Sequence, residues 1–366
     1  MIKNVNTRRM IDRSSDKITR NLPGTAAPAP SVTLDKALQS AANIHTLLRP
    51  ELTASRVGEQ ERGPCTPPTP SPLPSATKSP GWCYHSQSTC DHPCSVPEKW
   101  TVGNEDCGGK SQSPVNIVTR KAVREERLTP LEFKNYQHTF KTVMTNTGHS
   151  VQVNIPIISA ISGGDLSTTY KAVQLHMHWG KDGGPGSEHT IDGEQYPMEL
   201  HIVHMKNKYA DLATALRDPE GVAVLGFFYE VSKSPNRMYD TIIKGVQSVA
   251  SKNVSFSLPS ISLAQLIPPE RKLTSYYRYQ GSLTTPPCSE SVVWTVFETP
   301  IPLSMDQMKA FSMVQFHDSK SMVNNFRPVQ PLNGRLVYHS GGAALLVSSA
   351  LLAAALTTAL GLSQPN

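Results

Sequence analysis

Two histidines in the segment Gln174-Leu-His176-Met-His178-Trp179-Gly180 have the spacing of paired metal ligands. In a β-strand, side chains two residues apart lie on the same face, so His176 and His178 would project together. Imidazole nitrogens are common ligands of Zn²⁺. The pair alone does not establish a metal site, because histidine also occurs as a hydrogen-bonded core residue.

A third histidine lies in the segment Glu199-Leu-His201-Ile-Val-His204. His201 shares a face with Glu199, whereas His204 points the other way and is expected to be structural. A glycine-rich loop joins the two segments, which predicts antiparallel neighbours with the three imidazoles together. Three imidazoles and one open position are typical of a catalytic zinc site, while a structural site is closed by four protein ligands.

Two other kinds of metal enzyme are less favoured by this cluster. An iron site with two histidines and one carboxylate would use Glu199 as a ligand. Glu199 is better placed to accept the second ring N–H of a metal-bound histidine. A zinc esterase or peptidase would need a separate general-base carboxylate, as in His-Glu-x-x-His, and none is evident.

Short runs rich in Val, Ile, Tyr, Phe and Thr, punctuated by Gly, Pro and Asn, predict a β-rich domain from about residue 82. The expected strands are residues 150–155, 170–179, 199–205, 222–231 and 291–298. Helical signals are fewer and predict short helices over residues 211–218 and 305–311, the second with Ser304 as N-cap. A domain of about 260 residues can be built on a single core.

Both ends of the 366-residue chain differ from this domain. Residues 1–80 are polar and proline-rich, which predicts a disordered leader with local polyproline II, and no signal peptide is visible there. Residues 343–362 carry no charge and are long enough to span a bilayer. Small residues precede them, so a removable GPI-attachment signal with Ser340 as attachment residue is favoured over a retained transmembrane helix.

The charge pattern does not favour a nucleic-acid binder. The net charge is +6, but only 17% of residues are charged, and no stripe of Lys and Arg is interleaved with aromatic residues. Six cysteines allow fifteen complete pairings, so spacing alone does not assign disulfides.

Several longer motifs, in this order, resemble the α-class carbonic anhydrases: QLHMHWG, GSEHTIDG, ELHIVHMKN, AVLGFF, YYRYQGSLTTPPCSESVVW and NNFRPVQPLNGR. The resemblance covers about residues 82–335 and is strongest to the membrane-anchored carbonic anhydrase 4-like branch. It implies a single mainly β (α+β) catalytic domain over 81–338, built on a large twisted, mixed and mostly antiparallel sheet with short peripheral helices. Residues 339–366 would then be the anchoring tail.

The resemblance also implies an activity: zinc-dependent, reversible hydration of carbon dioxide to bicarbonate and a proton, by attack of zinc-bound hydroxide. One Zn²⁺ per chain would be held by His176, His178 and His201, and their outer nitrogens would bond to Gln174, Glu199 and the carbonyl of Asn325. Thr284 would donate to Glu188 and accept from the hydroxide. His149 would be the proton shuttle, exposed and with a near-neutral pKa, while Tyr84 and Thr147 order the connecting waters.

The family's apolar pocket matches a further set of positions. The resemblance places in or beside this pocket Val203, Val224, Leu283, Thr285, Val292 and Trp294. Gln152 and Gln174, together with Thr147, would line the wetter half of the cavity. His189 is expected to be structural.

The resemblance favours the disulfides Cys83–Cys94 and Cys107–Cys288 and assigns no partner to Cys65 or Cys90. Disulfides require an oxidising compartment, and Asn253-Val-Ser255 is a glycosylation sequon, so we expect a glycoprotein on the outer face of the plasma membrane. The expected partners are carbon dioxide, bicarbonate, water and the membrane. The alternative is a catalytically weak or inactive carbonic anhydrase-like binding module at the cell surface.

Overall fold

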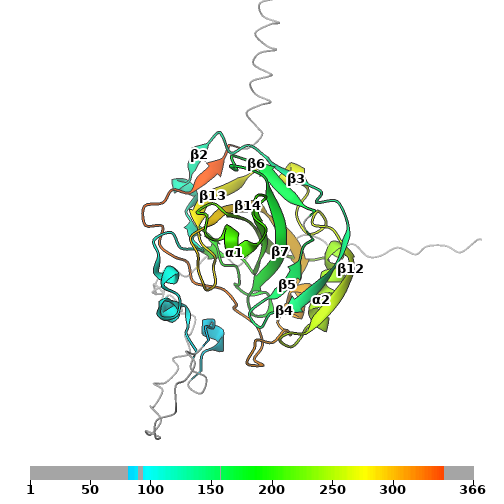
Figure 1. Cartoon of the computed structure of the whole chain (residues 1–366). Coiled ribbons are helices and arrows are strands. Elements are labelled where there is room, and N and C mark those ends of the chain that lie inside the picture. The colour runs from blue at the N-terminus through cyan, green and yellow to red at the C-terminus, as the bar shows by residue number, and fades with distance from the viewer. Residues whose placement is uncertain (1–80, 90–93, 157, 342–366) are drawn as a thin grey trace, which may run out of the picture. The chain divides into compact units, whose positions relative to one another are not determined.

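The computed structural model describes residues 81–89, 94–156 and 158–341. Most regular structure in these ranges is β (Figure 1). The strands are β1 (Asn116–Ile117), β2 (Val123–Glu125), β3 (Leu131–Lys134), β4 (Phe140–Asn146), β5 (Val151–Asn154), β6 (Ala160–Gly163), β7 (Tyr170–Trp179), β8 (Thr190–Ile191), β9 (Glu194–Gln195), β10 (Met198–Lys206), β11 (Val222–Ser232), β12 (Ser255–Ile261), β13 (Tyr276–Gly281), β14 (Val292–Ser304) and β15 (Tyr338–Ser340). The α-helices are α1 (Leu212–Ala215), α2 (Asp240–Ser248) and α3 (Met305–Phe311).

A 12-stranded sheet forms the framework of the domain. Ten of its strands follow the order β12-β4-β5-β7-β10-β11-β14-β13-β15-β2, while β6 pairs with both β3 and β7. The pairs β11–β14 and β15–β2 are parallel, and the other pairs are antiparallel. The predicted fold class, a large and mostly antiparallel mixed sheet with few short helices, is confirmed.

The central strands separate a core from a second face. On β7, Leu175 and Met177 are buried in the larger hydrophobic cluster, and His176 and His178 alternate with them. On β10, Leu200 belongs to the larger cluster and Val203 to a second one. The alternation of strand side chains therefore places the histidines of β7 on the face opposite this core.

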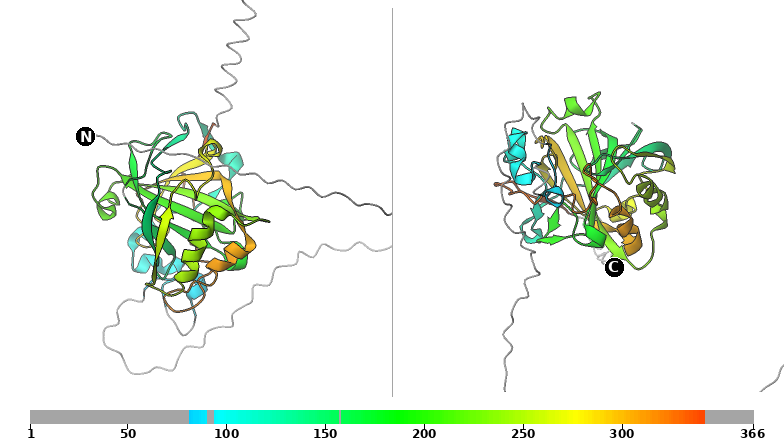
Figure 2. Two further views of the ribbon diagram at one scale, coloured as in Figure 1. Left: turned by 90° about the vertical axis from the view of Figure 1, so that its right-hand side faces the viewer. Right: turned by 90° about the horizontal axis from the view of Figure 1, so that it is seen from below.

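The helices lie at the periphery of the sheet. In Figure 2, α2 and α3 lie side by side against it. Helix α3 begins as predicted, because Ser304 and Gln307 form a reciprocal capping box. Helix α1 is shorter than the predicted 211–218: Asp211 caps it through Thr214 N–H, and it ends well before Pro219, whose ring disfavours helical backbone in the preceding residue.

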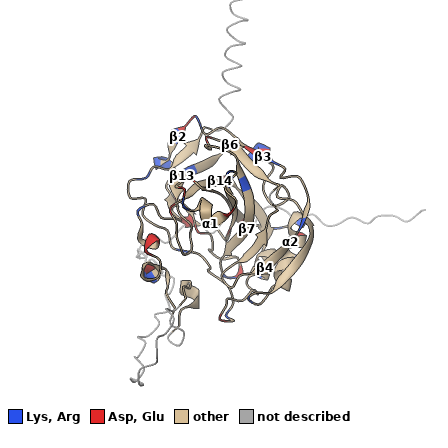
Figure 3. Cartoon of the chain, viewed as in Figure 1, with Lys and Arg blue, Asp and Glu red and all other residues tan. Residues whose placement is uncertain are grey.

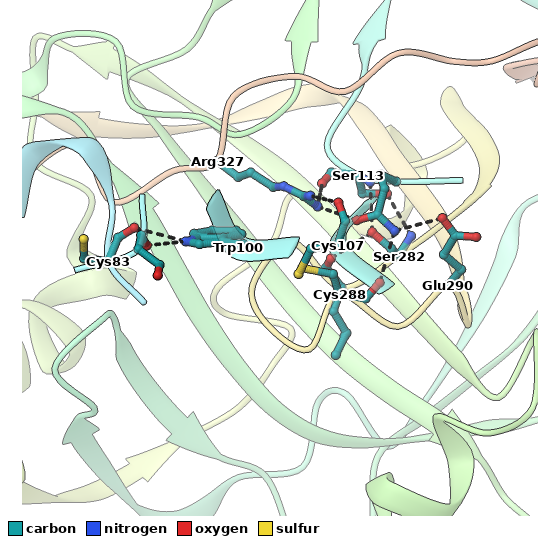
Figure 4. The surroundings of a disulfide bond; sticks show 11 residues. Cys83, Trp100, Cys107, Ser113, Ser282, Cys288, Glu290 and Arg327 are labelled. Carbon is teal, nitrogen blue, oxygen red and sulfur yellow. Dashed lines mark hydrogen bonds between the residues drawn. A yellow bond between two sulfur atoms is a disulfide. The ribbon is translucent and has the colours of Figure 1, made fainter. Parts of the chain in front are cut away.

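Two disulfides are present in the described chain, Cys83–Cys94 and Cys107–Cys288, as the resemblance implied. Figure 4 shows the second one beside Arg327 and Ser113. It joins the segment before β1 to the loop between β13 and β14, which are 181 residues apart in the sequence. Cys65 and Cys90 lie outside the described residues.

The predicted disordered leader and the uncharged segment 343–362 also lie outside the described residues. Among the helices that are described, none is both long and apolar enough to cross a bilayer. Basic and acidic residues are interspersed around the domain (Figure 3).

Candidate active site

Strand pairing brings the three predicted ligand histidines together. In the antiparallel pair β7–β10, His201 lies opposite His176, and Glu199 lies opposite His178. Each histidine offers one ring nitrogen to a group whose nitrogens all lie within 4.8 Å of one another. The Nδ1 of His201 and the Nε2 of His176 are 3.4 Å apart. The register of two strands thus converts separate sequence motifs into one site.

The outer nitrogen of each imidazole is occupied by a hydrogen-bond acceptor. His176 Nδ1 lies 2.9 Å from the side-chain oxygen of Gln174, and His178 Nδ1 lies 2.7 Å from the carbonyl of Asn325. His201 Nε2 lies 2.7 Å from Oε1 of Glu199. Acceptors at these positions fix each outer nitrogen as the N–H, so the inward nitrogens carry lone pairs.

This donor set fits a metal ion. The inward Nε2 of His178 is buried and has no hydrogen-bond partner in the described structure. Burial is the main cause that lowers the pKa of His178, and it lowers that of His176 well below the usual value, so these imidazoles are neutral as metal ligands must be. Three converging neutral nitrogens with an orphaned buried lone pair suit zinc.

Glu199 is oriented by contacts on both carboxylate oxygens. Oε2 accepts from the backbone N–H groups of Glu188 and His189, at 2.9 Å each, and Oε1 lies 2.7 Å from His189 Nδ1 as well as from His201. Burial alone would raise the pKa of Glu199, but the two imidazoles hold it well below the usual range. Glu199 is therefore an anionic acceptor whose bonds orient the histidine.

A glycine on the neighbouring strand leaves room for this carboxylate. Gly226 of β11 lies opposite His201, and a Cβ atom there would come within 3.1 Å of Oε1 of Glu199. His189 is completed on its other side by the hydroxyl of Tyr279, 2.7 Å from Nε2. That hydroxyl donates in turn to Ser113 Oγ at 2.9 Å. The expected structural role of His189 agrees with these contacts.

The predicted bond from Thr284 to Glu188 is not formed. Both residues are buried, and Oε1 of Glu188 accepts from the backbone N–H of Arg327 at 2.9 Å. Its Oε2 has no hydrogen-bond partner in the described structure and lies 3.4 Å from Nε2 of His178. The free carboxylate oxygen faces the imidazole nitrogens instead of the threonine hydroxyl.

Arg327 connects Glu188 to the buried loop network shown in Figure 4. Its guanidinium donates to the side-chain oxygen of Gln112 at 2.8 Å and to the carbonyls of Ser113 and Cys107 at 2.9 and 3.0 Å. Gln112 in turn donates to Glu290 at 2.8 Å. No role is predicted from the sequence for Gln112 or Arg327, although Arg327 lies in the motif NNFRPVQPLNGR, which resembles the family.

An apolar wall lies next to the histidines. Val203 pairs with Val224 across β10–β11, and Val224 pairs with Trp294 across β11–β14. The ring of Trp294 contacts that of His201, with centroids 4.8 Å apart. Val292 is buried in the same hydrophobic cluster, and Leu283 packs against it. The half-buried Thr285 follows the buried Thr284 in the connecting loop.

Most of the chain is similar in sequence to known proteins. Residues 95–341 match the sequence model of eukaryotic-type carbonic anhydrases. The chain belongs to this family. It is 39% identical over 277 residues to carbonic anhydrase 4 of Rattus norvegicus, covering 75% of this chain and 89% of that protein. Identity to carbonic anhydrase 4 of Oryctolagus cuniculus is 39% over 269 residues, or 73% and 86% of the two chains. Carbonic anhydrase 12 of Homo sapiens is 38% identical over 274 residues, or 72% and 76%. The predicted carbonic anhydrase activity and family are thus supported.

At the rim of this carbonic anhydrase site, His149 is half-buried. Its ring stacks on Trp82, with centroids 3.8 Å apart and planes 15° apart, and its Nδ1 is buried without a partner in the described structure. Burial, followed by nearby His317 and Lys252, lowers the pKa of His149 to about 4. The sequence predicted an exposed His149 with a near-neutral pKa. The structure differs, because the ring is half-buried and its pKa is lowered.

Of the two residues expected to order water, Tyr84 is buried and Thr147 is hydrogen-bonded within its own loop. Tyr84 is buried, and its pKa is raised well above the usual value by burial and by the charge of Glu188. The Thr147 hydroxyl donates to the carbonyl of Ser150 at 2.9 Å, which closes the loop that carries His149. Gln152 lies opposite His176 in the β5–β7 pair and donates to Asn154.

Proposed function

We propose that this carbonic anhydrase catalyses the zinc-dependent, reversible hydration of carbon dioxide to bicarbonate and a proton. The observation that carries the proposal is the group of three inward imidazole nitrogens, one of them buried without a partner. His176, His178 and His201 would hold one Zn²⁺ per chain. When bound in carbonic anhydrases, zinc lowers the pKa of a water ligand to about 7 and so supplies a nucleophile at neutral pH.

The protein's own contribution begins with binding the substrate. Carbon dioxide is small, linear and apolar, and the wall formed by Val203, Val224 and Trp294 offers an apolar surface beside His201. Val292, Leu283 and Thr285 would complete this pocket. The wall would hold the carbon of the substrate close to the histidine cluster without competing for hydrogen bonds.

Thr284 and Glu188 would orient the reacting water. Glu188 is fixed through Arg327, and its Oε2 is free to accept a hydrogen bond. A threonine hydroxyl has a single proton. Once it donates that proton to this oxygen it can only accept from other groups, so it would select a partner able to donate. This role requires Thr284 to turn toward Glu188 when the site is loaded.

The proton would leave through His149. In its stacked position this ring, with a pKa of about 4, does not hold a proton at pH 7. The relay therefore requires the ring to leave Trp82 for a more hydrated position, where its basicity returns toward the ordinary value. Tyr84 and Thr147 would shape the water path between His149 and the histidine cluster.

The location that we propose is the cell surface. The Asn253 sequon is exposed, as glycosylation requires. The residue proposed for GPI attachment, Ser340, ends β15, and its hydroxyl donates to the carbonyl of Thr274 at 2.9 Å. An anchor there would attach directly after β15, the last described strand. The domain boundary expected from the sequence, residue 338, falls inside this strand, so we place the end of the catalytic domain at Ser340.

The decisive test combines metal analysis with stopped-flow hydration of carbon dioxide. We expect about one zinc per purified chain and activity that a chelator removes and added Zn²⁺ restores. A zinc-loaded chain without hydration activity would favour the alternative of a surface binding module.

A further inference from the structure

A second polar site lies on β13, at the arginine that follows Tyr277. The side chain of Arg278 is 7% exposed. Its Nε donates to Oγ1 of Thr295 at 3.1 Å, and its Nη1 donates to the carbonyl of Gly164 at 2.8 Å. Its Nη2 is buried and has no hydrogen-bond partner in the part of the chain that is described. The guanidinium is thus only partly satisfied.

A buried arginine in this state is costly. A buried charge is normally paired and fully hydrogen-bonded. Among the described residues, however, no carboxylate lies within salt-bridge distance of Arg278. Arg327, the other buried arginine discussed above, makes three bonds through both terminal nitrogens and leaves only its Nε without a partner among the described residues. Arg278 makes two bonds and lies 5.6 Å from the centre of the Tyr276 ring, and one of its terminal nitrogens is unused. The unused N–H of Arg278 is therefore a group whose partner is missing.

Arg278 lines a cavity of about 190 Å³. A water molecule occupies about 30 Å³ of liquid, so this space admits a small molecule of a few heavy atoms. Ser167 and Tyr170 contribute hydroxyls to the lining, and Arg127 contributes a second guanidinium. The cavity does not include any of the three ligand histidines.

The acidic residues that line the cavity form ion pairs with cations other than Arg278. Glu125 accepts two bonds from the Arg127 side chain, at 3.1 and 3.0 Å. Glu220 lies 3.9 Å from Lys206. Asp165 lies 3.7 Å from Arg127, and its side chain is 42% exposed. A multiply charged anion would be repelled by these acids, whereas a singly charged one can pair with Arg278.

We propose that this cavity binds a small, singly charged planar oxyanion of the carboxylate type, with Nη2 of Arg278 as donor. The planar guanidinium matches the geometry of a carboxylate, and the volume of the cavity suits a ligand of a few heavy atoms. The site is independent of the proposed hydration reaction.

The experiment measures how acetate changes the thermal unfolding temperature of the zinc-loaded full chain, with sodium phosphate at equal ionic strength and pH as comparison. Acetate should raise the unfolding temperature of the wild type more than that of Arg278→Gln. Phosphate stabilises folded proteins by exclusion from their surface and should raise both temperatures equally. Arg278→Gln should weaken acetate binding about tenfold, the effect of losing a charge-assisted hydrogen bond. Arg335→Gln is the matched control, because Arg335 donates only to carbonyls and does not line the cavity.

Anions that bind at the histidine cluster would affect all these proteins alike, so the difference between variants isolates the cavity. A second variant, Asp165→Asn, removes one of the negative charges that line the cavity and should tighten acetate binding, which keeps the test valid if Arg278→Gln does not fold. Crystals soaked in acetate should show it beside Arg278. Equal stabilisation of wild type and Arg278→Gln, unchanged binding in Asp165→Asn, or an empty cavity after soaking would each overturn the proposal.

Discussion

The histidine cluster and the rim of the active site, where His149 lies, use the same residue type in opposite ways. In the cluster, every outer imidazole nitrogen has an acceptor within 2.9 Å, and the strands fix each ring. At the rim, His149 lies on a loop and stacks on Trp82, and its Nδ1 has no partner. Rings held by hydrogen bonds on strands are suited to bind a metal, whereas a ring held by stacking can move.

The largest expected effect is in the cluster. His201→Ala should abolish zinc retention and reduce carbon dioxide hydration to the uncatalysed rate, because two neutral nitrogens do not complete the site. Zinc content and stopped-flow hydration measure this result. His204→Asn is the matched control: His204 lies on the same strand but faces away and contacts the Tyr136 hydroxyl at 2.7 Å. Wild-type activity in His201→Ala would contradict the ligand assignment.

A smaller effect is expected at the rim. His149→Ala should lower the proton-transfer rate in weak buffer by about 10²-fold, the range for loss of a positioned acid–base group. Added imidazole should restore turnover, while the zinc content stays at that of the wild type. If turnover in weak buffer is unchanged, His149 does not carry the proton.

The next effect in size is expected at the residues that accept hydrogen bonds from the metal-binding histidines. Glu199→Gln keeps the shape of the side chain but weakens its bonds to the imidazoles, so zinc affinity should fall by about 10- to 100-fold. Competition with a chelator measures this change. Glu194→Gln, the same substitution at an exposed carboxylate on strand β9, is the matched control. Unchanged zinc affinity in Glu199→Gln would mean that the carboxylate does not affect how strongly His201 binds zinc.

The sequence predicted the cluster better than the rim for a physical reason. The two-residue period of strands places His176 and His178 on one face. The glycine-rich connection over residues 180–197 leads to β10, which pairs with β7 in antiparallel orientation. The contact between Trp82 and His149 depends on loop packing, which no local pattern encodes. The same limit applies to Glu188 and Thr284, whose expected bond depends on a loop side-chain conformation, and to the cavity at Arg278.

The smallest expected effect tests whether desolvation or cation–π attraction to Trp82 has the larger influence on the pKa of His149. The pKa of His149 is about 4, below the ordinary value of 6.5, so the unfolded chain binds the extra proton between these pH values. The contribution of this ring to stability is therefore present above pH 6.5 and is lost as the pH falls toward 4. Trp82→Ala should rehydrate one ring face and raise the pKa of His149 toward its ordinary value.

NMR titration of His149 in the wild type and in Trp82→Ala measures this change, with His204, whose pKa is also lowered to about 4 by burial, as the internal reference that should not move. Stacking on Trp82 could instead favour the protonated ring by a cation–π interaction, and its removal would then lower the pKa. A lower pKa in Trp82→Ala would show that attraction to the indole outweighs desolvation. The rim would then hold a charged shuttle in place, and the contrast with the rigid cluster would be one of charge and not of mobility.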